Sequence, residues 1–269
     1  MPTSQVELPQ LAGLPEAASL SSLELRPFGQ HYADIEIDFR RRARPALVTE
    51  VLGCCTSNGG ERPLDESFFR ELPVGVRLHA MVLLWLMSGR SADVGIRCSD
   101  ESCGADFEIT APLVVLLETA RAHDPGRPVE VAVGESSLRL RLPTGGDLER
   151  WAACAPSRAE IIAELLEDGS AIDTPADPTE LDLIEIALSA ADPLVDLELD
   201  GECPDCGRPF RVSFDIEAEA LRVLEGEQRA MLDTVDRIAR VYHWSEAEIL
   251  ALPRWRRRAY LDRIGEELR

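Results

Sequence analysis

Four of the seven cysteines form two pairs that are separated by roughly a hundred residues. Cys203 and Cys206 have two residues between them, whereas Cys98 and Cys103 have four. Two thiolates on one tight turn supply half of a tetrahedral zinc site with little loss of chain entropy, and a second such turn completes it. The pattern therefore predicts one structural zinc ion bound by all four cysteines, which would join two remote parts of the chain.

The two cysteine turns are alike beyond their sulfur atoms. Gly104 and Gly207 each follow the second cysteine of their pair directly, and glycine readily adopts the positive φ that lets backbone amides point at sulfur. Phe107 and Phe210 each lie four residues after the second cysteine. Strand-like segments flank both turns, so the order helix, strand, cysteine knuckle, strand and helix recurs. We interpret this recurrence as a weak internal duplication.

Other interpretations of the cysteines stay open at this point. The same four side chains could be unligated thiols, and a redox or iron–sulfur role is a third possibility. Four thiolate ligands would leave zinc no open coordination position, which argues against a catalytic zinc. Cys54, Cys55 and Cys154 lie in helical or helix-end segments, and we expect them to be inert, partly buried thiols.

The rest of the sequence predicts a mainly helical protein of the α+β class, with short β-hairpins carrying the two knuckles of one zinc-ribbon-like site. Aromatic residues make up only 5% of the chain, so the core must consist largely of Leu, Val, Ile and Ala, which favours helices. The predicted helices are 45–51, 64–71, 74–87, one from 144 or 147 through 151, one from 157, 177–190, 217–241, 246–250 and 254–267. The buried segment 112–119 is predicted to be helical or extended.

Strand-like alternation of apolar and polar residues supplies the predicted β-structure. It marks 33–39, 94–97, 107–110, 197–199 and 210–214, and a hairpin formed by 129–133 and 138–142. From these elements we predict four segments. They are a flexible N-terminal arm (1–22), an N-terminal segment (23–73), a helical, zinc-ribbon-like body with the β-hairpin 129–142 (74–216) and a C-terminal helical segment (217–269).

Charge and composition argue against nucleic acids and membranes as partners. The net charge of −21 repels phosphate backbones and anionic lipid head groups, so binding of the whole protein to nucleic acid is disfavoured. The longest apolar stretch, 80–87, is too short to span a bilayer. The first sixteen residues lack the basic start and apolar run of a secretion signal. We therefore expect a cytoplasmic bacterial protein without membrane contact.

No catalytic motif stands out in the sequence. It contains no nucleophile elbow, P-loop, dinucleotide fingerprint or paired-histidine zinc helix. His79 lies within an apolar helical stretch, which indicates a core histidine rather than a base. We therefore expect a protein that is not an enzyme and has no catalytic residues.

One basic cluster lies near the end of the chain. We interpret it as a helix face that forms ion pairs with this acidic chain or with a protein partner, while contact with nucleic acid is the alternative. Trp244, Trp255 and Tyr260 beside it predict a small aromatic core whose exposed part could anchor a partner. The arginines of the cluster are Arg254, Arg256, Arg257 and Arg258.

Three parts of the sequence together resemble the T4-type baseplate hub assembly protein family of contractile phages, prophages and extracellular contractile injection systems. They are the paired knuckles, the segment 140–144 with Asp147, and the tail 238–250 followed by 256–258 and 260–261. The resemblance covers about 74–264, and the tail is its most specific part. The wider spacing of Cys98 and Cys103 departs from the usual gap of two residues.

This resemblance implies a non-enzymatic assembly factor, or chaperone, or else a minor structural component of the baseplate hub. Its partners would be hub, spike or tube-initiator proteins, and it would act in the cytoplasm or be incorporated in a phage-tail-like particle. The alternative is a zinc-ribbon adaptor or regulatory protein that contacts nucleic acid or transcription machinery through the C-terminal arginines.

Overall fold

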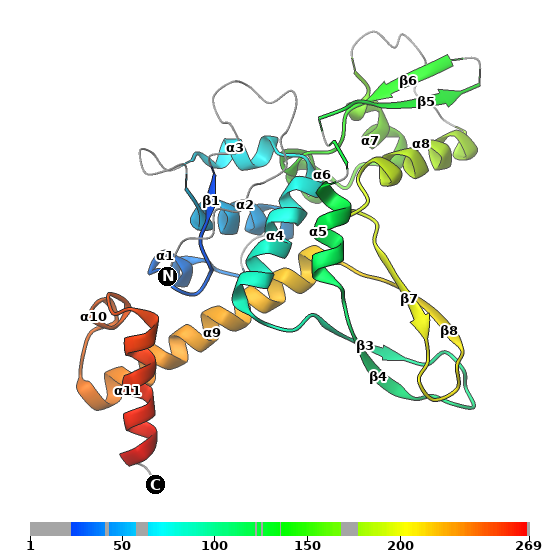
Figure 1. Ribbon diagram of the computed structural model, residues 1–269. Coiled ribbons are helices and arrows are strands. Elements are labelled where there is room, and N and C mark those ends of the chain that lie inside the picture. The colour runs from blue at the N-terminus through cyan, green and yellow to red at the C-terminus, as the bar shows by residue number, and fades with distance from the viewer. Residues whose placement is uncertain are drawn as a thin grey trace.

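The computed structural model describes residues 23–40, 43–57, 64–121, 123–124, 126–134, 136–167 and 177–267, and the predicted N-terminal arm lies outside them. These residues form a mainly helical fold with short two-stranded antiparallel sheets, as predicted (Figure 1). The helices are α1 (Ala33–Glu36), α2 (Arg44–Cys55), α3 (Glu66–Glu71), α4 (Val74–Ser88), α5 (Leu113–Arg121), α6 (Gly145–Cys154), α7 (Arg158–Leu165), α8 (Pro178–Ala191), α9 (Ile216–Tyr242), α10 (Glu246–Leu250) and α11 (Arg254–Glu267). The strands are β1 (Glu24–Leu25), β2 (Thr56–Ser57), β3 (Asp93–Arg97), β4 (Asp106–Thr110), β5 (Val129–Val133), β6 (Ser136–Leu140), β7 (Glu198–Glu202) and β8 (Pro209–Ser213).

Capping boxes open three of these helices, α6, α7 and α10. In each box a hydroxyl accepts a hydrogen bond from the backbone N–H three residues later, and the acidic side chain there accepts one from the backbone N–H of the first residue. Such a cap stabilises a helix by about 1 kcal/mol, because it satisfies donors that the helix leaves without partners. The three pairs are Thr144–Asp147, Ser157–Glu160 and Ser245–Glu248.

The largest hydrophobic core surrounds α4. This helix is buried from Val74 to Trp85 and packs against α2, α5 and α9. Apart from Arg77 and His79, the residues from Val74 to Trp85 are apolar or small on every side, as is typical of a helix that lies inside a protein rather than on its surface. The described part of the chain contains no helix that is both long and apolar enough to cross a membrane.

Two smaller cores flank the central one. The predicted hairpin is confirmed as β5–β6, with Val131 opposite Leu138, and it packs its apolar face on α7 and α8. The far end of the long helix α9 forms the third core with α10 and α11. There Tyr242, Trp244 and Tyr260 contact one another, while Trp255 is 72% exposed.

The prediction of a strand over 33–39 is wrong, because residues 33–36 form α1 and residues 37–39 belong to no strand. Asp34, which the alternation would place in solvent, is fully buried and accepts hydrogen bonds from Arg26 and from the backbone N–H groups of Gln30 and His31. These bonds hold the chain in a turn, and a buried ion pair overrides the strand-like pattern.

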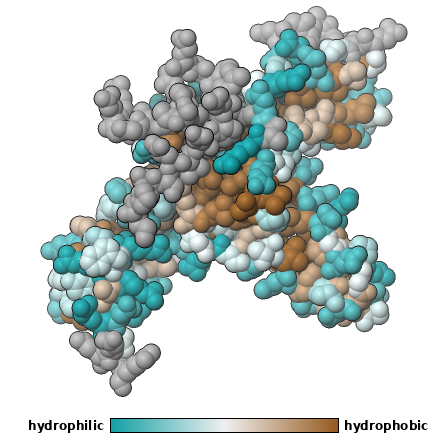
Figure 2. All heavy atoms as spheres, in the orientation of Figure 1, coloured by the Kyte–Doolittle hydropathy of each residue, from teal (hydrophilic) through white to brown (hydrophobic). Residues whose placement is uncertain are grey.

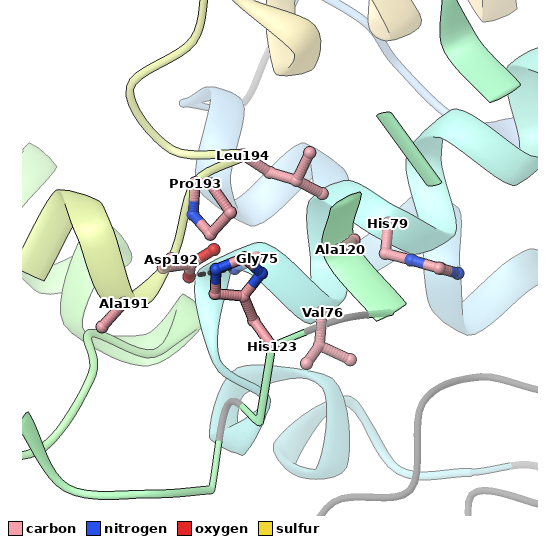
Figure 3. Close-up of a pocket in the computed structure, with 9 residues that line it drawn as sticks. All are labelled: Gly75, Val76, His79, Ala120, His123, Ala191, Asp192, Pro193 and Leu194. Carbon is pink, nitrogen blue, oxygen red and sulfur yellow. Dashed lines mark hydrogen bonds between the residues drawn. The ribbon is translucent and has the colours of Figure 1, made fainter. Parts of the chain in front are cut away.

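Two buried polar residues line a small pocket beside α4 (Figure 3). Asp192 accepts a hydrogen bond of 2.8 Å from the backbone N–H of Gly75 and so satisfies a donor in the first turn of α4. His79 is fully buried, and neither ring nitrogen has a hydrogen-bond partner among the described residues. The interpretation of His79 as a core histidine is therefore confirmed.

The burial of His79 predicts a dependence of stability on pH. Burial, with a smaller contribution from Arg121, lowers the pKa of His79 from 6.5 to about 4. The unfolded chain takes up a proton below pH 6.5 while the folded chain does not, so this contribution is complete above pH 6.5 and is lost as the pH falls toward 4. Between pH 7.5 and pH 5 the free energy of unfolding should fall by about 2 kcal/mol through this group.

His79→Leu should remove that part of the pH dependence. Urea denaturation of the parent protein and the variant at pH 7.5 and pH 5 measures it. Equal losses of stability between the two pH values in both proteins would show that His79 does not titrate in this way.

Candidate metal centre

Two hairpins, β3–β4 and β7–β8, carry the four paired cysteines at their tips. Ile96 lies opposite Phe107 in the first hairpin, and Gly201 lies opposite Phe210 in the second. Exposure alternates along every one of these strands, because side chains on a strand point to opposite faces in turn. The less exposed faces carry the apolar residues, and the ring centroids of Phe107 and Phe210 lie 5.5 Å apart.

The backbone shapes the two tips in the same way. The N–H of Cys98 donates to the carbonyl of Ala105, and the N–H of Cys203 donates to the carbonyl of Arg208, both at 2.8 Å. These bonds close the hairpins directly behind the first cysteine of each pair. Gly104 and Gly207 follow the second cysteines with positive φ values of 57° and 71°, as the sequence predicts.

The wider first pair is accommodated by an additional local turn. The side chain of Asp100 accepts a hydrogen bond of 2.9 Å from the N–H of Ser102, and its carbonyl accepts one of 3.0 Å from the N–H of Cys103. The N–H of Asp100 in turn points at the sulfur of Cys98, at 3.5 Å. The longer segment between Cys98 and Cys103 therefore forms a local turn, and the two cysteine sulfur atoms still lie close together.

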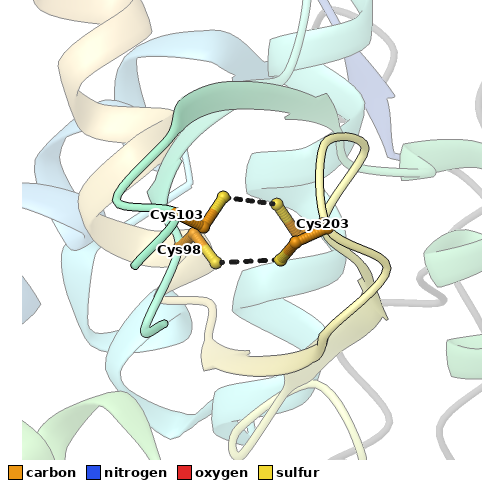
Figure 4. Close-up of side chains that lie close together, drawn as sticks. Cys98, Cys103 and Cys203 are labelled. Atoms are coloured by element: carbon orange, nitrogen blue, oxygen red, sulfur yellow. Dashed lines mark hydrogen bonds between the residues drawn. The ribbon is translucent and has the colours of Figure 1, made fainter. Parts of the chain in front are cut away.

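The structure brings all four predicted ligands together (Figure 4). The sulfur atoms of Cys98 and Cys206 are 3.6 Å apart, those of Cys103 and Cys203 are 3.9 Å apart, and all four lie within 4.8 Å of one another. Four sulfurs at about 2.3 Å from a central ion form a tetrahedron whose edges are about 3.8 Å. The cluster could therefore hold one metal ion.

The surroundings of the sulfur atoms differ from one cysteine to the next. Cys98 and Cys203 are buried, Cys103 is half-buried and Cys206 is exposed. The backbone N–H groups of Cys206 and Asp205 point at the sulfur of Cys203, which lowers its pKa to about 7. These N–H dipoles stabilise the thiolate of Cys203 even without a bound cation.

Cys103 shows the opposite effect. The N–H of Ala105 favours its thiolate, yet desolvation and the other three sulfur atoms outweigh this and raise the pKa of Cys103 to about 12. Four closely spaced thiols thus compete for their protons, since adjacent negative charges repel. A bound cation removes that repulsion, which makes the cluster more suitable for metal binding than for free thiolates.

An ion pair between the hairpins accompanies the sulfur cluster. Arg208, beside the second knuckle, lies 3.0 Å from the carboxylate of Asp100 in the first knuckle. Each residue lies two positions after a cysteine in the sequence, but no spacing rule predicts that they pair. The exposure of the arginine limits its effect on stability to roughly 0–1 kcal/mol.

The remaining cysteines lie apart from the cluster. Cys55 is buried and Cys54 is half-buried, with its sulfur 3.2 Å from a guanidinium nitrogen of Arg26. Cys154 is exposed, so the prediction of partial burial is wrong for that residue. It lies in the last turn of α6, whose only buried residues are at the opposite end of the helix.

Comparison with protein-family models, with curated proteins and with solved structures finds no match for this chain. The resemblance to the baseplate hub assembly family therefore remains a prediction. The convergence of the four cysteines alone indicates the metal centre.

Alanine substitutions at Gly207 and Gly226 should change the stability of the protein in opposite directions, which tests the left-handed backbone of the knuckle. At Gly207, where φ is +71°, a side chain meets no neighbouring atom but strains the backbone, so Gly207→Ala should destabilise the protein by roughly 1–2 kcal/mol. Gly226 lies inside α9 with equally open space, so Gly226→Ala should stabilise it by about 0.5–1 kcal/mol. Urea denaturation of both variants measures the difference, and a change of the same sign in both would contradict it.

Proposed function

We propose that Cys98, Cys103, Cys203 and Cys206 bind one zinc ion as a structural centre. We also propose that the chain is a non-enzymatic assembly factor or a minor component of the baseplate hub of a contractile tail or injection system. The observation that carries the first proposal is the convergence of four sulfur atoms from two remote segments. Tetrahedral sulfur sites select zinc or iron, and zinc suits a purely structural role because it has no redox chemistry.

A metal ion would stabilise parts of the fold that have little stability of their own. An isolated two-stranded hairpin is marginal in water, and β3–β4 and β7–β8 are both of this kind. Structural zinc contributes about 10–16 kcal/mol of apparent binding free energy in small zinc domains. A zinc ion at the knuckles would therefore hold two weak hairpins together as one body.

The C-terminal arginines favour the assembly role over the nucleic-acid adaptor. Arg257 is buried, Arg258 lies 3.3 Å from Asp262, and Arg256 lies over the ring of Tyr260. Arg257 thus packs in the core, whereas Arg254, Arg256 and Arg258 are exposed. Arg254 lies 4.0 Å from Glu227, and Arg258 is next to Asp262, so carboxylates of this chain offset part of the charge of the cluster. The net charge of −21 also disfavours binding to nucleic acid.

Exposed apolar side chains supply surface for protein partners. Figure 2 shows hydrophobic surface in the middle of the face where α4 and α5 lie. Val114 and Val115 of α5 are 59% and 54% exposed, and Ile186 of α8 is 66% exposed. Exposed apolar patches commonly mark protein–protein contacts, as an assembly factor requires. The identity of the partners as hub, spike or tube-initiator proteins comes from the resemblance alone.

The zinc centre predicts one equivalent of zinc in the purified protein. Replacing both Cys203 and Cys206 by serine should abolish zinc binding and lower the melting temperature, because two ligands are insufficient to hold the ion. Cys154→Ser, an exposed cysteine outside the cluster, should change neither quantity. Elemental analysis and thermal unfolding measure both effects. A parent protein without bound metal, or a double variant that melts like the parent, would refute the zinc centre.

The assembly role predicts a phenotype in the bacterial host. Deleting the gene should abolish intact sheath–tube particles, and the parent chain and the Cys154→Ser variant should restore them. The double serine variant should not restore the particles, because its hairpins are no longer held together. Electron microscopy of lysates, with co-purification of hub or spike proteins, measures this. Normal particles in the deletion strain, or salt-sensitive nucleic-acid binding by the pure protein, would favour the adaptor instead.

A further inference from the structure

A groove lies between the two cysteine-bearing hairpins, next to the start of α5. Its volume is about 430 Å³, and β4, α5 and the whole of β7 line it. Ile109, Leu116 and Leu197 give it apolar walls, together with the ring of Phe210. The apolar faces of the two hairpins are thus only partly covered by each other.

One side of β7 has free backbone hydrogen-bonding groups along this groove. Among the described strands β7 pairs only with β8. The N–H of Phe214 donates to the carbonyl of Leu197, and the N–H of Cys203 donates to the carbonyl of Arg208. Backbone groups alternate in direction along an antiparallel strand, so those of residues 198, 200 and 202 point away from β8. Each of these three residues presents one donor and one acceptor at the open edge.

The same three residues give this edge a negative charge. Glu198, Asp200 and Glu202 are all exposed, and all three line the groove. Arg211 lies 3.5 Å from Glu198, whereas in the described part of the chain no arginine pairs with Asp200 or Glu202. The exposed Glu108 on β4 adds a further carboxylate to the neighbouring hairpin. The groove therefore combines apolar walls, an open strand edge and uncompensated negative charge.

We infer that this groove binds an extended segment of a partner protein, in which apolar residues alternate with arginine or lysine, as an added strand on β7. Backbone hydrogen bonds to the open edge would hold the segment, apolar side chains would enter the groove, and basic ones would meet the carboxylates. The inference rests on the metal-clamped body proposed above, because the clamp fixes the two walls relative to each other.

The charge of the edge selects this occupant over others. A second copy of this chain is repelled, because acidic side chains on an edge strand oppose pairing between identical strands. Residues 1–22 of the chain itself contain no arginine or lysine, so they lack the complementary charge. A basic segment from another protein satisfies both the edge and the groove.

A synthetic peptide tests the inference. The probe is an N-acetylated, C-amidated peptide of nine alternating valine and arginine residues, with a fluorophore for anisotropy, titrated into the full-length protein. Asp200→Arg should weaken binding by about tenfold, because it replaces an attraction by a repulsion near the centre of the added strand. Asp233→Arg, an equally exposed carboxylate on α9, should leave the affinity unchanged.

Strand addition is tested by a second peptide, N-methylated at alternate amides on the edge that would face β7. Methylation removes the hydrogen-bond donors but keeps the charge, so binding should be lost. The inference is overturned if the methylated peptide binds as well as the parent peptide. It is also overturned if Asp200→Arg and Asp233→Arg bind the parent peptide with equal affinity.

Zinc content is measured in the same samples so that the two proposals fail separately. Zinc-loaded protein that does not bind the peptide overturns the groove and leaves the metal centre intact. Protein that contains no metal and still binds the peptide overturns the metal centre and supports the groove.

Discussion

The convergence of four sulfur atoms at the tips of β3–β4 and β7–β8 is the constraint on which the hairpin region depends. The two knuckles come from segments about a hundred residues apart, and among the described strands each hairpin beneath them pairs only within itself. Without a link at the tips, the hairpins would be held together mainly by the contact of Phe107 with Phe210 and by the partly exposed ion pair of Arg208 with Asp100. A metal ion bound at this point would replace the mutual repulsion of the thiolates by attraction of all four to one cation.

The bases of the hairpins connect that link to the central core. The chain enters β3 from α4 and leaves β8 into α9, and these two helices pack against each other. Phe214, at the end of β8, contacts Trp85 of α4 with ring centroids 6.3 Å apart. The hairpins are thus fixed to the core at one end, and their cysteines converge at the other. Such a frame keeps the surfaces between them in a constant shape, which suits binding of other proteins.

Much of the secondary structure could be predicted from short local signals in the sequence. Ser157 with Glu160, Ser245 with Glu248, and Asp177 before Pro178 each mark a helix start that the structure confirms. These signals act over three or four residues, so they need no knowledge of the fold. The four cysteines could be grouped for a related reason, since each knuckle is a short motif with recognisable glycine and phenylalanine positions.

What could not be predicted depends on contacts between remote residues. The strand predicted at 33–39 does not form, because Asp34 is buried against Arg26 in a helical turn, and no local pattern reveals that ion pair. The pairing of Arg208 with Asp100 and the groove along β7 arise only when the two hairpins face each other.

X-ray absorption at the zinc edge of the purified protein tests the metal centre most directly. The account predicts a single shell of four sulfur atoms at about 2.3 Å. Absence of zinc, or a shell in which nitrogen or oxygen replaces any of these sulfurs, would contradict it.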